Sequence, residues 1–532
     1  MAQTYDAVVI GAGHNGLTCA CYLAKAGLQV LVLEQSHRIG GMTITEEVTL
    51  PGFRSDVHAY GYQLANLSPT PRELQLTAFG FALIRPEPVF VHAFPDGGMI
   101  AFSNDLEKTV QSIARYSKRD AQTWRMLFST YQAIKPQVID ALFSPPMTFT
   151  AQAAQFEQLP GGMDLYRASL QSTRSWCDEL FESEEMKTVM AAWPMHAGVG
   201  PDDGGGAHFA FLFVAVMQDL GNNLVQGGMH HLTHALARYL QQHGGAIRTH
   251  ARVHRVLVED GRAVAVRLDD GEEIQVRGLV ASNVDPQQLT LTLLGEAQVG
   301  AEITRKMRRY ELGDAYFGIY MALDGAVEWQ ARPEAGTAGY VHPAPASLES
   351  LAQVYVECRA GKLPAAPLLI VGNDSRIDPS RAPAGKHVMK ILVANVPYDI
   401  KGDATGKISS RHWDEVKEQY ADHLIDLLAE TYLPDLKSRL LCRVAYSPLD
   451  YERGISTAVR GTIVHGAFKP YQLNALRPIP ELGHYRSPVA NVYLCGAGSH
   501  PGPGVSMAPG RNAAQVICGD LGIDFNRLVT SV

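Results

Sequence analysis

The stretch that decides the fold is YDAVVIGAGHNGLTCACYLAKAGLQVLVLEQ, residues 5–35. Residues 6–10, which are apolar apart from Asp6, are typical of a strand buried on both faces of a parallel sheet. Gly11, Gly13 and Gly16 follow at the spacing G-x-G-x-x-G. This spacing allows a tight turn, brings backbone close to a pyrophosphate and lets the next helix pack against the sheet. The pattern therefore predicts a dinucleotide-binding strand–turn–helix unit.

The residues after the glycine turn complete this unit. Residues 15–26 are small and apolar and predict a helix whose first N–H groups face the phosphates, and Gly27 ends it. A second strand closes with Glu34, at the position where an acidic side chain holds the ribose hydroxyls. Because a carboxylate there repels a 2′-phosphate, the pattern disfavours NADP at this site.

The segment after Glu34 points to a flavin nucleotide. Arg38, Gly40 and Gly41 form R-x-G-G, which predicts a cation and a second glycine loop beside the same pyrophosphate. In this order of motifs the chain resembles the amine oxidase/phytoene desaturase superfamily of flavoproteins. The resemblance implies FAD as the cofactor and places residues 51–60, PGFRSDVHAY, near the flavin.

A second matching region lies at 225–286. Its apolar residues fall on one helical face, namely Leu232, Ala235, Leu236, Tyr239 and Leu240. Alternating segments at 246–258, 263–268 and 274–282 predict strands joined by tight turns. Composition alone gives a helix and a β-meander. The resemblance implies that this region returns to the FAD domain, with Val253 against the adenine.

The third matching region is C-terminal, at 491–522. A strand at 492–495 leads through a glycine loop into a helix that starts near Met507, with Ser506 as its N-cap. The resemblance implies that this helix points its positive end at the flavin N1–C2=O edge. The loop is most similar to that of the phytoene dehydrogenase-related branch.

These matches give a fold and a cofactor site. The fold class is α/β, with a Rossmann-like FAD-binding domain assembled from the discontinuous segments 1–75, 222–299 and 485–532, and an inserted α+β substrate domain formed by 76–221 and 300–484. The resemblance implies that FAD contacts Gly11, Gly13, His14, Asn15, Gly16, Glu34, Gln35, Arg38, Gly40, Gly41, Met42, Val253, Gly498, Val505, Ser506 and Met507.

The branch includes a group named for a pyridine nucleotide-disulphide oxidoreductase domain, so the cysteines matter. The seven cysteines are scattered without a CxxC pair or a metal-ligand spacing, and no second nucleotide fold is visible. We therefore reject thiol–disulphide chemistry, a metal site and a dedicated NAD(P)H domain. One FAD, reoxidised by oxygen, a quinone or a carrier protein, is the simpler interpretation.

Composition limits the remaining possibilities. A chain of 532 residues exceeds one compact core, and its net charge of −8 argues against nucleic acid as a partner. The first strand starts too early for a targeting peptide, and no apolar run reaches the ~18 residues of a membrane span. We expect a cytoplasmic protein, with peripheral contact to a membrane as an alternative. The Ala/Pro/Gly-rich residues 330–350 predict a long surface loop.

Two apolar stretches bear on the substrate. FAFLFVAVM, 209–217, predicts a core or tunnel-lining helix. The proline-broken stretch 143–162 suits a lid, a tunnel mouth or a membrane-surface contact, and an ordinary buried connector is the alternative.

The chemistry is less fixed than the cofactor. His58, His465 and His500 lie in segments that resemble the flavin-lining parts of the superfamily, and His500 is our choice of catalytic residue because its loop must cross the flavin edge. We expect hydride transfer from an apolar substrate of polyene or isoprenoid type to flavin N5. The alternatives are an amine oxidase, a non-redox flavin isomerase and a flavin-free binding or escort protein. The intact glycines, Glu34 and Arg38 argue against the last of these.

Overall fold

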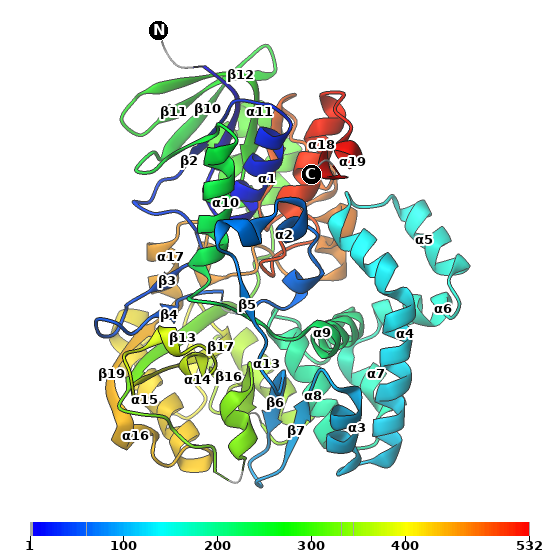
Figure 1. Ribbon diagram of the computed structural model, residues 1–532, viewed down its shortest axis with the longest axis vertical. Helices are drawn as coiled ribbons and strands as arrows, with labels where there is room; N and C mark the ends of the chain where they lie inside the picture. The colour runs from blue at the N-terminus through cyan, green and yellow to red at the C-terminus, as the bar shows by residue number, and fades with distance from the viewer. Residues whose placement is uncertain (1–3, 60, 331, 344, 531–532) are drawn as a thin grey trace.

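The computed structural model describes residues 4–59, 61–330, 332–343 and 345–530 (Figure 1). Two seven-stranded sheets form its frame. The first has the order β10-β11-β12-β1-β2-β9, with β20 beside β12. Its strands are β1 (Tyr5–Ile10), β2 (Val30–Leu33), β9 (Ala246–Arg248), β10 (Val253–Glu259), β11 (Arg262–Leu268), β12 (Glu273–Ser282) and β20 (Val492–Leu494).

Strand β1 lies at the centre of this sheet, between β12 and β2, and is parallel to both. Ala7 and Val9 face one core, while Val8 and Ile10 face the other. All four are buried, because helices or loops cover both faces. The sequence prediction of a strand buried on both faces is confirmed.

The first core is closed by three helices, α1 (His14–Lys25), α10 (His230–Gln242) and α18 (Ala508–Asp520). In Figure 1 they appear in blue, green and red at the top, because they come from distant parts of the chain. The strands likewise come from three segments, so the predicted Rossmann-like arrangement of discontinuous pieces is confirmed. The predicted domain boundaries themselves stay a prediction.

The second sheet has the order β19-β13-β17-β16-β14-β6-β7. Its strands are β6 (Phe90–Ala93), β7 (Met99–Phe102), β13 (Ala315–Leu323), β14 (Val341–Pro343), β16 (Leu369–Gly372), β17 (His387–Val396) and β19 (Leu440–Tyr446). One face packs on α15 (Trp413–Thr431). The other face shares a core with α8 (Glu184–Met195) and α9 (Gly206–Leu220) and faces the cavity described below.

A helical layer flanks this second sheet, at the right of Figure 1. Its other members are α3 (Leu106–Ala114), α4 (Lys118–Phe143), α5 (Phe149–Gln158), α6 (Gly162–Leu170) and α7 (Thr173–Leu180). Helix α5 contains no buried residue. The buried-connector alternative is therefore wrong for α5, which lies with α6 at the margin of the molecule.

One prediction fails in the second sheet. Residues 330–350 are not a surface loop throughout, because β14 pairs with β6 and β16, and Val341 and His342 are fully buried. A strand of three residues is too short to show a hydrophobic alternation in sequence.

Two element boundaries also differ from the prediction. The segment 246–258 divides into β9 and β10, because His250 takes a left-handed conformation with φ of 52° and redirects the chain. Met507, with φ of 64°, is the N-cap of α18, and Ser506 lies one residue before it. The Ser506 hydroxyl still accepts a hydrogen bond from the N–H of Ala508, at 3.3 Å.

Candidate cofactor and substrate site

A cavity of about 670 Å³ lies between the carboxyl ends of the first sheet and the inner face of the second. We call one end the nucleotide end; it is lined by the loops that follow β1, β2 and β12 and by residues 251–254. The other is the substrate end, which α4, α5, α9 and the second sheet line. The carboxyl ends of parallel strands are where dinucleotides bind in such sheets.

The glycines of the nucleotide end leave space that side chains would fill. A Cβ on Gly13 would lie 2.8 Å from Asn283 Nδ2, and a Cβ on Gly16 only 2.2 Å from the carbonyl oxygen of Gly11. Gly41 has φ of +56°, and a Cβ there would lie 3.3 Å from Cα of Gly13. The two glycine loops therefore lie close together. The space between them has room for a ligand but not for side chains at the glycine positions.

The N-terminus of α1 opens into this space. His14 and Asn15 line the cavity, and Oδ1 of Asn15 is buried without a hydrogen-bond partner in the described part of the chain. Burial lowers the pKa of His14 to about 4, so its ring is neutral at pH 7. The positive potential here therefore comes from the helix N–H groups, which suit a pyrophosphate.

Glu34 follows β2 and is almost fully buried. Its Oε2 accepts a hydrogen bond from the N–H of Ala12 at 2.8 Å, and its Oε1 accepts one from the N–H of Ser36 at 2.9 Å. A carboxylate has about four acceptor positions. Glu34 is therefore held in place by backbone and keeps capacity for two ribose hydroxyls.

Most of the predicted site residues come together at this cavity. Those that line it are Gly11, Gly13, His14, Asn15, Glu34, Gln35, Gly41, Met42, Val253, His500, Val505 and Ser506. Gly16, Gly40, Gly498 and Met507 lie behind the wall, and Arg38 forms an ion pair with Glu46 instead of lining the cavity. A direct contact between Arg38 and the pyrophosphate stays a prediction.

The start of α18 is joined to the end of α4. His500 Nε2–H donates to the carbonyl oxygen of Ala141 at 2.9 Å. Arg511 Nη1 donates to the carbonyl of Phe143 at 2.6 Å, and Asn512 Nδ2 donates to the carbonyl of Leu142 at 3.0 Å. These contacts cap the free carbonyls of α4 and fix the wall of the substrate end against the nucleotide end.

His500 has its side chain committed to this contact. Burial lowers its pKa to about 4, and Nδ1 is buried with no hydrogen-bond partner among the described residues. His58 and His465 also line the cavity, and burial lowers their pKa values to about 3 and about 4. The predicted catalytic role of His500 stays a prediction. Its contacts are those of a residue that positions its neighbours.

The substrate end is apolar. Its lining residues include Ile134, Val138, Leu142, Met147, Phe156, Leu159, Leu165, Val199, Phe209, Phe211, Leu212, Phe213, Val216, Ile370, Leu392, Ile455, Ile463 and Phe468. Among the described residues that line the cavity, the only side chains with a formal charge at pH 7 are Glu34 and Arg252, both at the nucleotide end. A substrate buried here would meet no fixed charge.

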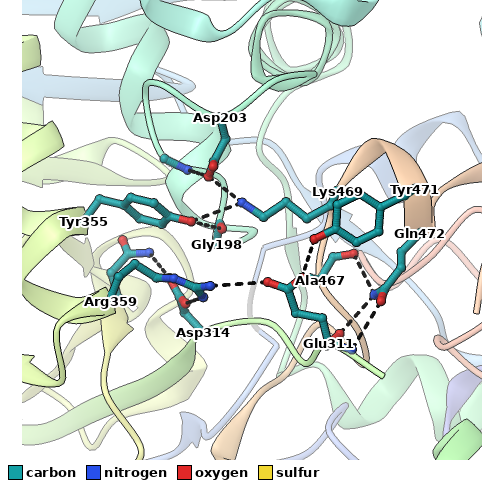
Figure 2. Close-up of polar contacts among 12 residues, drawn as sticks. Gly198, Asp203, Glu311, Asp314, Tyr355, Arg359, Ala467, Lys469, Tyr471 and Gln472 are labelled. Atoms are coloured by element: carbon teal, nitrogen blue, oxygen red, sulfur yellow. Dashed lines mark hydrogen bonds and ion pairs between the residues drawn. The ribbon is translucent and has the colours of Figure 1, made fainter. Parts of the chain in front are cut away.

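One wall of the cavity is the loop 462–477, which a polar network fixes from outside (Figure 2). Lys469 Nζ lies 2.5 Å from Asp203 Oδ2 and 3.1 Å from the Tyr355 hydroxyl. Burial works to raise the pKa of Asp203, but hydrogen bonds from Lys469, Tyr355 and the N–H of Gly200 lower it overall. Asp203 is therefore ionised, and the pair joins this loop to the helical layer.

A second set of contacts in Figure 2 continues the network. Arg359 on α13 (Leu348–Arg359) contacts Asp314 and Glu311, each at 3.3 Å. Glu311 also accepts a hydrogen bond from the Tyr471 hydroxyl. The network adds no charge to the cavity, because all its charged groups lie behind the lining residues.

Sequence analysis missed several lining residues. Asn283 follows β12 directly, and a polar residue at the carboxyl end of a parallel strand is a signal that could have found it. His196, Tyr316 and Tyr340 meet only through tertiary packing, and no local pattern marks them.

Two further observations concern metal ions and membranes. In the described ranges no group of three His, Cys, Asp or Glu side chains is arranged to hold a metal ion. No helix of the described chain has the length and hydropathy to cross a bilayer.

A pyrophosphate cradle joined to a deep, uncharged substrate end defines a flavoprotein oxidoreductase of two-sheet architecture. The chain belongs to the family described as flavin containing amine oxidoreductase, whose model matches residues 16–518. It is therefore an FAD-dependent oxidoreductase, so a flavin-free escort function is set aside. The predicted superfamily is confirmed, and phytoene desaturases are among the relatives.

Three similarities illustrate the relationship. The chain is 31% identical to pyridine nucleotide-disulfide oxidoreductase domain-containing protein 2 of Mus musculus, over 97% of this chain and 94% of that protein. It is 29% identical to a component of the limonene dehydrogenase of Castellaniella defragrans, over 98% of this chain and 95% of that one. The crystal structure of an oxidoreductase from Methanosarcina mazei matches with a TM-score of 0.61 at 17% identity, over 97% of this chain and all of that one (100%).

Proposed function

We propose that this enzyme is a dehydrogenase or desaturase that removes hydride from a lipophilic substrate of polyene or isoprenoid type. The observation that carries the proposal is the uncharged, apolar substrate end of the cavity. Burial in such a site favours an apolar substrate by about 25 cal/mol per Å² of apolar surface. The name of limonene dehydrogenase, a relative of this chain, supports the same substrate class.

The residues of the nucleotide end fit FAD, because the glycine loops, the α1 N-terminus and Glu34 supply its phosphate and ribose contacts. Bound FAD supplies the hydride acceptor, its N5 atom. Val505 and Ser506 would place the positive end of α18 where negative charge develops. The capping contacts on α4 hold the substrate wall against this end and exclude water. His208 and His465 also line the cavity, and burial lowers the pKa of each to about 4, so both rings are neutral at pH 7.

The α5–α6 pair is the proposed entrance for substrate or a quinone. Gln152, Gln155 and Phe156 on α5 line the cavity, while Phe149 at the start of α5 is 77% exposed. An exposed aromatic beside a cavity-lining helix suits contact with a membrane surface or a micelle that carries the substrate.

An amine oxidase is the second candidate, because it shares the family. A substrate ammonium needs a carboxylate or an aromatic cage to replace its hydration. No described carboxylate lines the substrate end. Only aromatic side chains such as Tyr316 and Tyr340 are left to hold an ammonium there, so the lining favours an uncharged substrate.

The test is anaerobic bleaching of the flavin against a panel of polyenes, isoprenoid alcohols and amines. We expect bleaching by lipophilic substrates and little by amines. Rapid bleaching by amines alone would identify an amine oxidase, and product rearrangement without bleaching would identify an isomerase. We also expect NADPH not to reduce the flavin at a useful rate, because Glu34 repels a 2′-phosphate; bleaching by NADPH within one turnover time would contradict the single-nucleotide interpretation.

A further inference from the structure

Three histidines meet where the second sheet closes the substrate end. His92 lies on β6, His342 on β14, and His196 directly after α8. Ring centroids of His196 and His342 are 4.9 Å apart, and those of His92 and His342 are 5.7 Å apart. His92 and His342 are fully buried, whereas His196 lines the cavity. The cluster therefore presents one ring to the cavity and two behind it.

All three rings are neutral at pH 7. Burial lowers the pKa of His92 and of His196 to about 3, and lowers that of His342 well below its usual range. Nε2 of His196 lies 3.1 Å from Nε2 of His342. Between two neutral imidazoles one nitrogen donates and the other accepts, so the two rings hold opposite tautomers.

The surroundings decide which ring donates. Nδ1 of His342 is buried without a partner among the described residues. A buried N–H without a partner is rarer in proteins than an unpaired acceptor. We therefore assign the proton of His342 to Nε2, which donates to Nε2 of His196. His196 then carries its proton on Nδ1, which makes no hydrogen bond within the described part of the chain. Because His196 lines the cavity, we take this N–H to be available to a ligand there.

The position of His196 is fixed by its neighbours. The Tyr316 hydroxyl donates to the carbonyl oxygen of His196. The ring of Trp193 lies 4.8 Å from that of His196 and 4.6 Å from that of His342. The free N–H is thus held by a rigid aromatic layer at the apolar end of the cavity.

We propose that His196 binds an uncharged oxygen of the substrate, a hydroxyl or carbonyl group, through its Nδ1–H, so that the substrate is a lipophilic alcohol, aldehyde or ketone and not a plain hydrocarbon. The inference rests on the proposed function and names the substrate class more closely. A carboxylate is disfavoured, because a neutral ring offers no charge and no Lys or Arg among the described residues lines this end. A fixed donor in an apolar pocket selects the oxygen, because the N–H is left unpaired when the oxygen is missing.

The experiment compares matched ligands on the FAD-loaded enzyme. Dissociation constants of farnesol, farnesene and farnesoic acid are measured from changes in the flavin absorption spectrum. We expect farnesol to bind about 10- to 100-fold more tightly than farnesene, the range set by one buried hydrogen bond, and also more tightly than farnesoic acid. His196→Phe should bring the farnesol-to-farnesene ratio close to one, and His196→Asn should restore part of it through its amide N–H.

His92→Phe is the matched control, because it changes the same cluster without reaching the cavity, and it should keep the ratio. FAD content and thermal unfolding of each variant report whether it has folded. Equal binding of farnesol and farnesene to the wild type would overturn the inference while leaving the proposed function in place. So would an unchanged ratio in His196→Phe. If neither ligand changes the flavin spectrum or is oxidised, the proposed function fails together with the inference.

Discussion

The nucleotide end and the substrate end share one cavity, yet the chain builds them differently. At the nucleotide end, backbone supplies most of the recognition: glycine loops approach closely and Glu34 is held by two N–H groups. At the substrate end, side chains from α4, α5, α9 and the second sheet supply an apolar wall, and His196 lies in it. A backbone site tolerates little added volume, whereas a side-chain site is adjustable in shape and polarity.

The sharpest test of this comparison is Gly13→Val. Because even a Cβ would lie 2.8 Å from Asn283 Nδ2, the side chain must displace the wall or the pyrophosphate. We expect FAD affinity to fall more than 100-fold, which is about 3 kcal/mol or more. FAD content after gel filtration measures it. Gly519→Ala is the control, because a Cβ there meets no atom within 4 Å. Normal FAD content in Gly13→Val would show that the cofactor lies elsewhere.

Glu34→Ala should have the next largest effect. Loss of charge-assisted hydrogen bonds to the ribose weakens FAD by roughly 1.5–3 kcal/mol. Titration of apoprotein with FAD, followed by flavin fluorescence, gives the dissociation constant. Glu34→Gln keeps the shape of the side chain and should lose less FAD affinity than Glu34→Ala. An unchanged constant in both variants would remove Glu34 from the cofactor site.

The histidines of the substrate end predict an acid-sensitive fold. The pKa of His92 is about 3 in the native state and near 6.5 when unfolded, so the unfolded chain binds the proton and stability falls as pH drops below about 6.5. At pH 5 one such histidine lowers the free energy of unfolding by roughly 2 kcal/mol. The titratable group facing it is His342, which in turn faces His196. Urea unfolding at pH 7 and pH 5 should therefore show a smaller loss in His92→Phe than in the wild type. Equal losses would mean that His92 is not held neutral.

Substitutions at the proposed entrance should have the smallest effects, and we expect different effects at Phe156 and Phe149. Phe156→Glu places a charge in the cavity wall and should raise KM for a lipophilic substrate roughly 5- to 10-fold. Phe149→Glu is exposed and should change KM only when the substrate is delivered in lipid vesicles. If both variants instead fail to fold, α5 stabilises the fold although it contains no buried residue, and the entrance is not supported. If neither changes KM, the entrance lies elsewhere.

Some of the architecture can be predicted from local patterns. Three elements were predicted in this way: the G-x-G-x-x-G turn, the apolar face of α10 and the strand before α18. Each depends on residues only a few positions apart, so its pattern predicted both the element and the neighbouring segment that it packs or pairs with. Strand β14 escaped prediction, because three buried residues carry no period and their partners lie in β6 and β16. Arg38 forms an ion pair with Glu46, which the R-x-G-G pattern does not reveal, and its expected contact with the phosphates stays a prediction.

The sequence by itself determined the cofactor class and the scaffold, because dinucleotide binding uses backbone geometry that glycine spacing and one carboxylate encode locally. Only the tertiary structure decided the character of the substrate end. His196 and His342 are far apart in the chain, and their tautomers, neutrality and exposure depend on burial between the second sheet and α8. A histidine in a sequence has an ordinary pKa and two accessible tautomers; the packing around it selects one, and with it the group that we propose a substrate carries.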